Sequence, residues 1–179
     1  MDNPFLIGER IYLRPLDKED LDRCLQWIND PEITSTLTMR FPMSRTQEEN
    51  WILSHYKDQA DLPLAIVIKE QDQHIGNCGL HSIDYVNRNA EFGIMIGKKE
   101  QWGRGYATEA ARLIIDYGFN QLGMHRIFLR VYSHNKRALR AYEKVGFTLE
   151  GTMREAYFRD GLYHDELIMS ILKSEWPRS

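Results

Sequence analysis

The sequence predicts a single α/β (more strictly α+β) domain, built on a central, mostly antiparallel mixed sheet flanked by about four helices. Two observations indicate this fold. Short β-branched or alternating runs recur from residue 10 to residue 172, and segments with helical apolar spacing separate some of them. The chain has 179 residues, which suits one domain with a proper core and hardly two. We therefore expect residues 1–179 to form one domain.

The first part of the chain predicts one strand and two helices. Arg10–Arg14 alternates and is rich in strand-forming residues. Asp17 is a typical helix-capping residue, and the apolar residues after it keep helical spacing until Asn29-Asp30-Pro31 ends the helix. A second helix is predicted to start at Thr46, because Glu49 stands three residues later as in a capping box.

Three strands joined by short polar turns come next. We predict strands over Leu64–Ile68, His74–Tyr85 and Ala90–Gly97, with turns at Asp72-Gln73 and Asn87-Arg88-Asn89. Connections this short join antiparallel neighbours, so the three strands are expected to lie side by side.

The remaining third of the chain predicts two helices and a closing β region. Apolar spacing defines the helices, Gly146 is a typical helix-ending residue, and a two-residue Asp-Gly segment is a typical hairpin turn. The predicted helices are Thr108–Asn120 and Asn135–Val145, and Ile127–Tyr132 is the predicted strand between them. From Phe147 onward the chain is predicted to be β again, with a hairpin turn at Asp160-Gly161 between Ala156–Arg159 and Glu166–Leu172.

Composition excludes several classes of protein. The 23 Lys and Arg against 26 Asp and Glu give a net charge of −3, which does not suit a nucleic-acid binder held by bulk charge. No apolar run approaches the roughly 18 residues of a membrane span, and residues 1–10 lack a signal-peptide pattern. Cys24 and Cys78 are too few for a disulfide framework or a four-ligand zinc site. We expect a cytoplasmic protein with no metal ion and no nucleic-acid or membrane partner.

The most informative segment is a glycine loop between a predicted strand and a predicted helix. Gly103-Arg104-Gly105 follows the strand ending at Gly97 and precedes the helix starting at Thr108. Backbone N–H groups in such a loop point into one concavity, and a helix N-terminus adds about half a positive charge. The loop therefore favours a phosphate or pyrophosphate, although the same glycines also suit a plain turn. It matches neither the Rossmann fingerprint nor the P-loop.

A second informative segment follows the strand Ile127–Tyr132. Asn135 begins a short amphipathic helix, and Tyr142 falls on its apolar face with Leu139 and Val145. A tyrosine there either belongs to the core or faces a site, and its spacing alone is compatible with both.

Together the two segments resemble the GCN5-related N-acetyltransferase (GNAT) superfamily, whose loop pattern is Gln/Arg-x-x-Gly-x-Gly/Ala. The matching stretches are Trp102-Gly103-Arg104-Gly105-Tyr106-Ala107 and Asn135…Ala138…Tyr142-Glu143-Lys144…Gly146-Phe147. The resemblance covers nearly the whole chain, and Ile11–Leu16 and Phe147–Gly161 resemble its RimJ/RimL-type branch. Trp102 departs from the pattern, because the superfamily usually has Gln or Arg there.

This resemblance implies an acetyl-CoA-dependent N-acetyltransferase. Acetyl-CoA would lie between the strand ending at Gly97 and the strand starting near Ile127, with its pyrophosphate on the loop amides. Its pantetheine arm would pair with the backbone of Met95 and Ile96, and Asn135 would bond a pantetheine amide. The cofactor-binding residues implied are Met95, Ile96, Gly97, Trp102, Gly103, Arg104, Gly105, Tyr106, Ala107, Thr108, Asn135 and Ala138.

The same resemblance implies two catalytic residues. Tyr142 would donate a proton to the departing CoA thiolate, since a hydroxyl with a pKa near 10 is a fitting acid. Glu91 is our choice for the base that accepts the amine proton, directly or through water, although it equally suits a surface ion pair with Arg88 or Lys69. A water chain and three histidines are alternative bases: His81, His125 and His134.

The acceptor amine is left open by the sequence. In the superfamily the two N-terminal helices, the loop between them (Thr34–Thr46 here) and the last hairpin wall its pocket. We therefore expect lining from Met39, Phe41, Trp51, Tyr85, Tyr157 and Tyr163. Ala90–Asp116 and Phe147–Met169 also resemble bacterial spermidine/spermine N-acetyltransferases, and the carboxylates available to a polyamine are Glu32, Glu48, Glu49, Asp84 and Glu91. Thr38–Met43 lacks the acidic cluster of those enzymes. A polyamine, the N-terminal alanine of a ribosomal protein, an amino sugar and an aminoglycoside all stay open.

Two other classes of function compete with catalysis. A non-catalytic acyl-CoA-binding module would keep the loop Gly103–Thr108 but would lack the residue that protonates the CoA thiolate. A protein-interaction domain would use the glycines only to turn the chain. Lys98–Lys144 has ten basic against four acidic residues, which suits a phosphate-rich cofactor, while the acidic remainder suits a cationic amine. A homodimer, common among relatives, is a further expectation.

Overall fold

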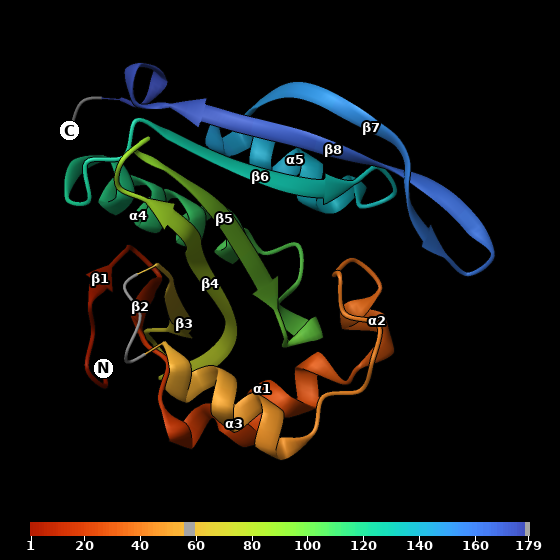
Figure 1. Ribbon diagram of the computed structural model, residues 1–179. Coiled ribbons are helices and arrows are strands. Elements are labelled where there is room, and N and C mark those ends of the chain that lie inside the picture. The colour runs from red at the N-terminus through yellow and green to blue at the C-terminus, as the bar shows by residue number, and fades with distance from the viewer. Residues whose placement is uncertain (56–59, 178–179) are drawn as a thin grey trace.

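The computed structural model describes residues 1–55 and 60–177, which form one eight-stranded sheet with five α-helices (Figure 1). The strands are β1 (Leu6–Ile7), β2 (Ile11–Pro15), β3 (Leu62–Ile68), β4 (Gln73–Asp84), β5 (Asn89–Ile96), β6 (Arg126–Tyr132), β7 (Thr148–Arg159) and β8 (Leu162–Leu172). The helices are α1 (Leu21–Ile28), α2 (Pro31–Thr34), α3 (Arg45–Ser54), α4 (Tyr106–Asn120) and α5 (Lys136–Val145). The mixed, mostly antiparallel fold class is confirmed. No helix among the described residues is long and apolar enough to cross a membrane.

The sheet is antiparallel everywhere except between β5 and β6. The strand order is β1-β2-β3-β4-β5-β6-β8-β7. β5 and β6 are parallel and pair only from Asn89–Glu91 to Arg126–Phe128. Beyond these pairs the two strands diverge, so the sheet opens into a V between β5 and β6 (Figure 1).

Helices cover both faces of the first half of the sheet. Ile11 and Leu13 of β2 join a large core with Ile114 of α4, whereas Tyr12 joins a second core with Cys24 of α1. Because side chains alternate along a strand, β2 is buried on both faces. The β7–β8 hairpin extends away from this body, towards the segment that contains α2 (Figure 1).

Two local predictions about the N-terminal helices need correction. The cap of α3 is Ser44, not Thr46, because the Ser44 hydroxyl accepts from the Gln47 backbone N–H and Gln47 accepts from the Ser44 N–H. These two bonds complete a capping box two residues earlier than predicted. Glu49 instead pairs with Lys18 at 2.8 Å.

The segment Asn29-Asp30-Pro31 ends α1 and also begins α2. The Asp30 carboxylate accepts from the N–H groups of Glu32 and Ile33, which starts a four-residue helix where the sequence predicted a loop. The two-residue strand β1 was also not predicted. At the other end, the hairpin turn at Asp160-Gly161 joins β7 and β8 as predicted. β7 begins at Thr148, next to the predicted start at Phe147, whereas β8 begins at Leu162, before the predicted Glu166.

A buried polar network joins α1 to the sheet. The Asp20 carboxylate, 2% exposed, accepts two hydrogen bonds from Arg14 at 2.6 and 2.8 Å and lies 3.0 Å from Nδ1 of His74. Burial alone would raise the pKa of Asp20, but the hydrogen bonds from Arg14 and His74 outweigh it and hold that pKa well below its usual range. Asp20 is therefore ionised in the folded protein at neutral pH.

Asp20→Asn is expected to lower the free energy of unfolding by about 3 kcal/mol at pH 7, because it leaves Arg14 buried without its counter-charge. A depressed carboxyl pKa stabilises the fold above the unfolded value of about 4, and this contribution disappears as the pH falls. Urea unfolding at pH 7 and pH 3 measures the difference between the two proteins. A difference that is the same at both pH values would contradict this account.

Candidate functional site

The main cavity lies where β5 and β6 separate and has a volume of about 590 Å³. Four parts of the chain line it: Glu91–Ile96 of β5, the glycine loop with the first turn of α4, the end of β6, and α5. Residues 36–39, after α2, close one end. The opening of the sheet is thus bounded by both segments that the sequence marked as chemically informative.

The glycine loop is held in the conformation that only glycine adopts easily. Gly103 and Gly105 have φ of 75° and 87°, and Gly105 occupies the cap position of α4 without any side-chain cap. The backbone N–H groups in the first turn of α4 therefore remain available to donate hydrogen bonds to a ligand. Glu109 ties this turn to β2, because its carboxylate accepts from the backbone N–H groups of Arg10 and Ile11.

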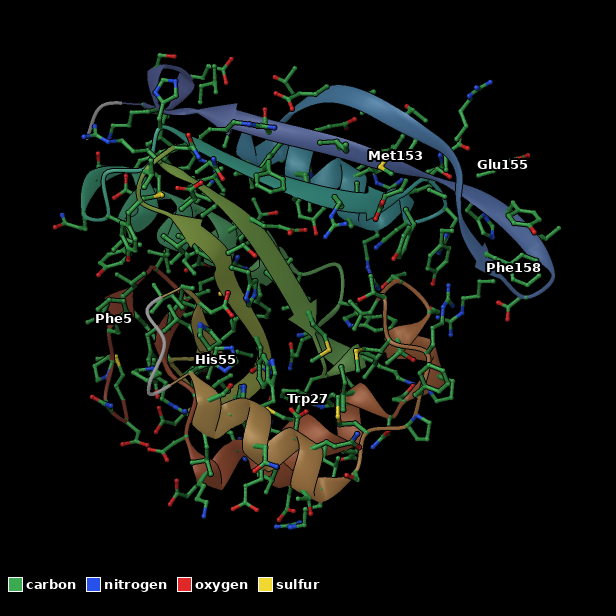
Figure 2. The ribbon with its side chains drawn as sticks, viewed as in Figure 1. Phe5, Trp27, His55, Met153, Glu155 and Phe158 are labelled. Atoms are coloured by element: carbon green, nitrogen blue, oxygen red, sulfur yellow. The ribbon has the colours of Figure 1, made fainter. Side chains whose placement is uncertain are left out.

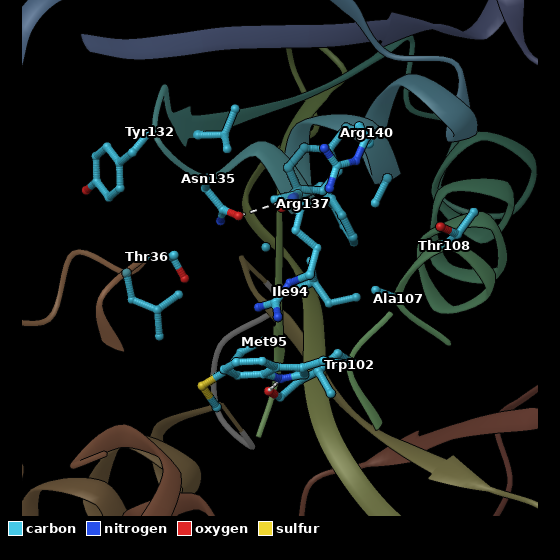
Figure 3. Close-up of a pocket in the computed structure, with 18 of the residues that line it drawn as sticks. Thr36, Ile94, Met95, Trp102, Ala107, Thr108, Tyr132, Asn135, Arg137 and Arg140 are labelled. Carbon is cyan, nitrogen blue, oxygen red and sulfur yellow. Dashed lines mark hydrogen bonds between the residues drawn. The ribbon is translucent and has the colours of Figure 1, made fainter. Parts of the chain in front are cut away.

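The open edge of β5 presents backbone groups to the cavity. The backbone N–H of Gly97 donates to the carbonyl of Ile75 in β4. Successive residues of a strand direct their N–H and C=O groups to opposite sides. The peptide groups of Ile94 and Ile96 therefore point away from β4, into the opening between β5 and β6. The Ile96 carbonyl accepts from Trp102 Nε1 at 2.7 Å (Figure 3). The Met95 backbone, in contrast, faces Asn77 of β4 in the register of the two strands.

An arginine crosses the cavity from α5 to the loop. The Arg137 guanidinium carbon lies 3.9 Å from the centre of the Trp102 ring, and Figure 3 shows the side chain extending from α5 down to the indole. Burial lowers the pKa of Arg137, which still leaves it charged at neutral pH. This stacked pair brings a cation to the side of the cavity where the loop amides lie.

Asn135 and Tyr142 occupy the α5 wall of the cavity. Asn135 caps α5 by accepting from the Ala138 N–H at 3.1 Å. Tyr142 packs edge-on against Phe92 and Phe147, and its hydroxyl has no hydrogen-bond partner among the described residues. Burial raises the pKa of Tyr142 to about 12, so the hydroxyl stays protonated and able to donate at neutral pH.

Charged residues lie beside the opening between β5 and β6, on the face of the sheet opposite α4 and α5. Arg130 of β6 donates to both carboxylate oxygens of Glu91, at 3.0 and 3.4 Å. This corrects the expected partners Arg88 and Lys69 for Glu91. Tyr132 and Glu166, which pair in register across β6 and β8, line the cavity beside them.

Comparison with known proteins identifies the family. The family described as "Acetyltransferase (GNAT) domain" matches residues 10–148. The chain belongs to the GNAT acetyltransferase family. It is an N-acetyltransferase by this membership.

The relatives that match this GNAT enzyme align with almost all of its chain. The chain is 33% identical over 171 residues to the spermidine N(1)-acetyltransferase of Escherichia coli (strain K12), covering 93% of this chain and 88% of the relative. It is 30% identical to the Bacillus subtilis (strain 168) protein named "Putative ribosomal N-acetyltransferase YdaF", covering 95% of both chains. The Vibrio cholerae spermidine N-acetyltransferase, solved with CoA and spermine, superimposes with a TM-score of 0.87 at 32% identity, covering 93% of this chain and 97% of that one.

Most residues predicted for the site are brought together by the GNAT fold. Among the residues predicted to bind the cofactor or to act in catalysis, Gly97 and Arg104 do not line the cavity, and neither do the three histidines considered as alternative bases. Of the predicted acceptor-pocket residues only Met39 lines it, whereas Phe41 lines the second cavity and the other four aromatic residues line neither. Gly97 has a structural task, since a Cβ there would lie 1.9 Å from the ring of Trp27, which projects from α1 towards the sheet (Figure 2). Arg104 offers its carbonyl to Arg10.

Several residues that line the cavity were not predicted from the sequence, among them the charged residues Arg130, Arg137 and Glu166. Arg130 and Tyr132 alternate with the buried Leu129 and Val131 on β6, so a period-two pattern was available as a signal. Nothing local in the sequence indicates that Arg137 stacks on Trp102.

Arg137→Ala is expected to weaken CoA binding about tenfold, because it removes a cation beside the loop amides and exposes the Trp102 ring. Trp102→Phe keeps a ring for stacking but loses the bond to Ile96, so it should weaken binding less. Titration calorimetry with CoA measures both variants. Arg154→Ala, an equal charge change on exposed β7, is the control, and equal effects at Arg137 and Arg154 would contradict the assignment.

Proposed function

We propose that this GNAT enzyme transfers the acetyl group of acetyl-CoA directly to a primary amine while both substrates are bound. The observation that carries the proposal is the single cavity in which the glycine loop, the open edge of β5 and Tyr142 meet. A phosphate-binding loop at one end and a protonated hydroxyl beside the opening suit a CoA thioester.

Acetyl-CoA is proposed to lie along the opening of the sheet. Its pyrophosphate would rest on the amides from Gly103 to Thr108, where the helix N-terminus favours negative charge. The pantetheine would extend β5 as an added strand, bonding the peptide groups of Ile94 and Ile96, with Asn135 beside it. The carbonyl of Ile96 already accepts a hydrogen bond from Trp102. Either the pantetheine would replace Trp102 as the donor to this carbonyl, or it would bond the peptide groups of Ile94 alone.

Acetyl transfer requires that the attacking amine is neutral and that the departing CoA thiolate receives a proton. The amine nitrogen forms a bond to the thioester carbonyl carbon, and the C–S bond breaks. Tyr142 is proposed to donate its proton to the departing thiolate. Glu91 is proposed to hold the incoming ammonium, whose proton passes to a base directly or through water.

A polyamine is the first candidate for the acceptor. Relatives named as spermidine acetyltransferases support it, one of them solved with spermine. Glu91 and Glu166 line the cavity beside Tyr132, and two carboxylates with an aromatic ring suit a cationic chain. A cytoplasmic location and a homodimer belong to the same proposal.

The N-terminal amine of a peptide is the second candidate, as in the RimJ/RimL-type branch. A second cavity of about 560 Å³ shares Met39 with the first and is lined by Arg40, Phe41, Phe158 and Arg159. Two arginines and two aromatic rings suit a peptide better than a polycation. The relative named for ribosomal N-acetylation supports this alternative.

Free-thiol release from acetyl-CoA with a panel of amines decides between them. Spermidine, spermine, an alanine-initiated peptide, an amino sugar and an aminoglycoside are the panel. Spermidine or spermine is expected to give the highest kcat/KM, because the cavity carries two carboxylates. Turnover with the peptide alone would favour the second candidate, and CoA binding without turnover on any amine would contradict the enzymatic proposal.

Tyr142→Phe removes the hydroxyl and keeps the ring packed on Phe92 and Phe147. The expected result is a loss of about 100-fold in kcat, with the CoA dissociation constant within twofold of the original. With a pKa of about 12 the hydroxyl keeps its proton up to at least pH 10, so no alkaline decline from this group is expected below that pH. Tyr117→Phe, where the ring packs on Phe5 outside the cavity, is the control. Equal turnover in the two variants would contradict the role of Tyr142.

A further inference from the structure

A cluster of ionisable side chains lies on the charged face of β4, next to the cavity. Nδ1 of His81 lies 3.4 Å from one oxygen of Asp61, and Nε2 of His55 lies 3.5 Å from the other. His55 ends α3 (Figure 2), and its Nδ1 lies 2.6 Å from the Trp51 carbonyl. Asp61 also accepts from the Ser82 N–H at 2.9 Å, which fixes the carboxylate against β4.

Two glycines make room for the His81 ring. Gly79 and Gly93 face each other in the register of β4 and β5. A Cβ on Gly79 would lie 2.7 Å from Nε2 of His81, and a Cβ on Gly93 would lie 3.3 Å from the same atom. The imidazole therefore lies over this glycine pair, with Nε2 directed at a strand whose residues Glu91 and Gly93 line the cavity.

The surroundings leave Nε2 able to accept a proton. The carboxylate beside Nδ1 favours the tautomer that carries its hydrogen on Nδ1, so the lone pair is on Nε2. Nε2 has no hydrogen-bond partner among the described residues, and the His81 side chain is 34% exposed, so water reaches it. The charged or titratable groups that face His81 from the described elements are Asp61, His55 behind it, and Glu91 with Arg130.

Glu91 is held in an ion pair, whereas Nε2 of His81 is open to water. Arg130 engages both of its carboxylate oxygens, at 3.0 and 3.4 Å. His81 and Glu91 are directly opposite in the register of β4 and β5, so a proton released at Glu91 has only a short path to Nε2. Glu91 is placed to orient an ammonium group, and His81 to hold the proton that this group gives up.

We propose that Asp61 and His81 form the proton-accepting pair of acetyl transfer, with Nε2 of His81 receiving through water the proton that the bound ammonium loses. This inference rests on the proposed function. The neutral amine then attacks the thioester carbonyl carbon, and Tyr142 gives its proton to the departing CoA thiolate. The nitrogen loses a second proton as the amide forms, and this proton restores the Tyr142 hydroxyl. His81 afterwards releases its proton to solvent, so each turnover yields the amide, CoA and one proton.

Variants at the two residues test the pair. His81→Gln keeps a polar side chain that cannot accept a proton at neutral pH, and Asp61→Asn keeps the shape while removing the charge. Asp22→Asn is the matched control, because Asp22 is an exposed carboxylate of α1 that lies outside the cavity. For each protein, kcat/KM is measured from pH 5.5 to 9 with the best amine of the panel, and CoA affinity is measured by calorimetry.

His81→Gln is expected to lose about 100-fold in kcat/KM at pH 7 with unchanged CoA affinity, and to lose the inflection of the wild-type pH profile. Asp61→Asn is expected to lose about tenfold in kcat/KM with unchanged CoA affinity, because the imidazolium that forms on proton transfer no longer has a carboxylate beside it. A purely structural role of His81 would leave the inflection in place. Asp22→Asn should follow the original protein.

Turnover of His81→Gln within twofold of the original at pH 7 would overturn the proposal, and so would turnover of Asp61→Asn within twofold of the original. The second variant decides the matter if His81→Gln fails to bind CoA. Inactivity of the unaltered protein with every amine would contradict the proposed function itself. An active protein indifferent to both substitutions would contradict only this pair.

Discussion

The early end of pairing between β5 and β6 is the constraint on which the rest of the structure depends. The two strands share only three residue pairs before they diverge. Continued pairing would satisfy the backbone groups of Ile94 and Ile96 within the sheet and fill the space that the cavity occupies. Divergence instead leaves an open strand edge beside the glycine loop, which is the arrangement that a thioester with a phosphate-rich tail needs.

Apolar packing keeps the strands apart. After β6 the chain enters α5, whose Leu139 and Tyr142 pack on the same core as Ile94 and Ile96. β6 itself continues to Tyr132 and stays paired with β8, so only its pairing with β5 ends, while α5 covers the core beside the opening. On the opposite face Arg130 and Glu91 bridge the two strands at the point where they begin to separate. Burial of the helix face thus supports the opening that the site requires.

The cofactor end was predictable from the sequence and the acceptor end was not. Gly103-Arg104-Gly105 and the segment from Asn135 to Tyr142 are local patterns, because the loop conformation and the helix cap depend on adjacent residues. The pair Glu91 and Arg130 joins strands that are distant in sequence, so no spacing rule reveals it. The cap of α3 was misplaced for a related reason, since Ser44-Gln47 and Thr46-Glu49 are equally good local patterns and tertiary contact with Lys18 occupies Glu49.

The most direct test of the account is a crystal structure of the chain with CoA. The account predicts the pyrophosphate on the amides from Gly103 to Thr108, the pantetheine between β5 and β6 bonded to the backbone of Ile94 or Ile96, and the sulfur within reach of the Tyr142 hydroxyl. A CoA molecule bound elsewhere on the surface, or strands β5 and β6 paired along their length, would contradict it.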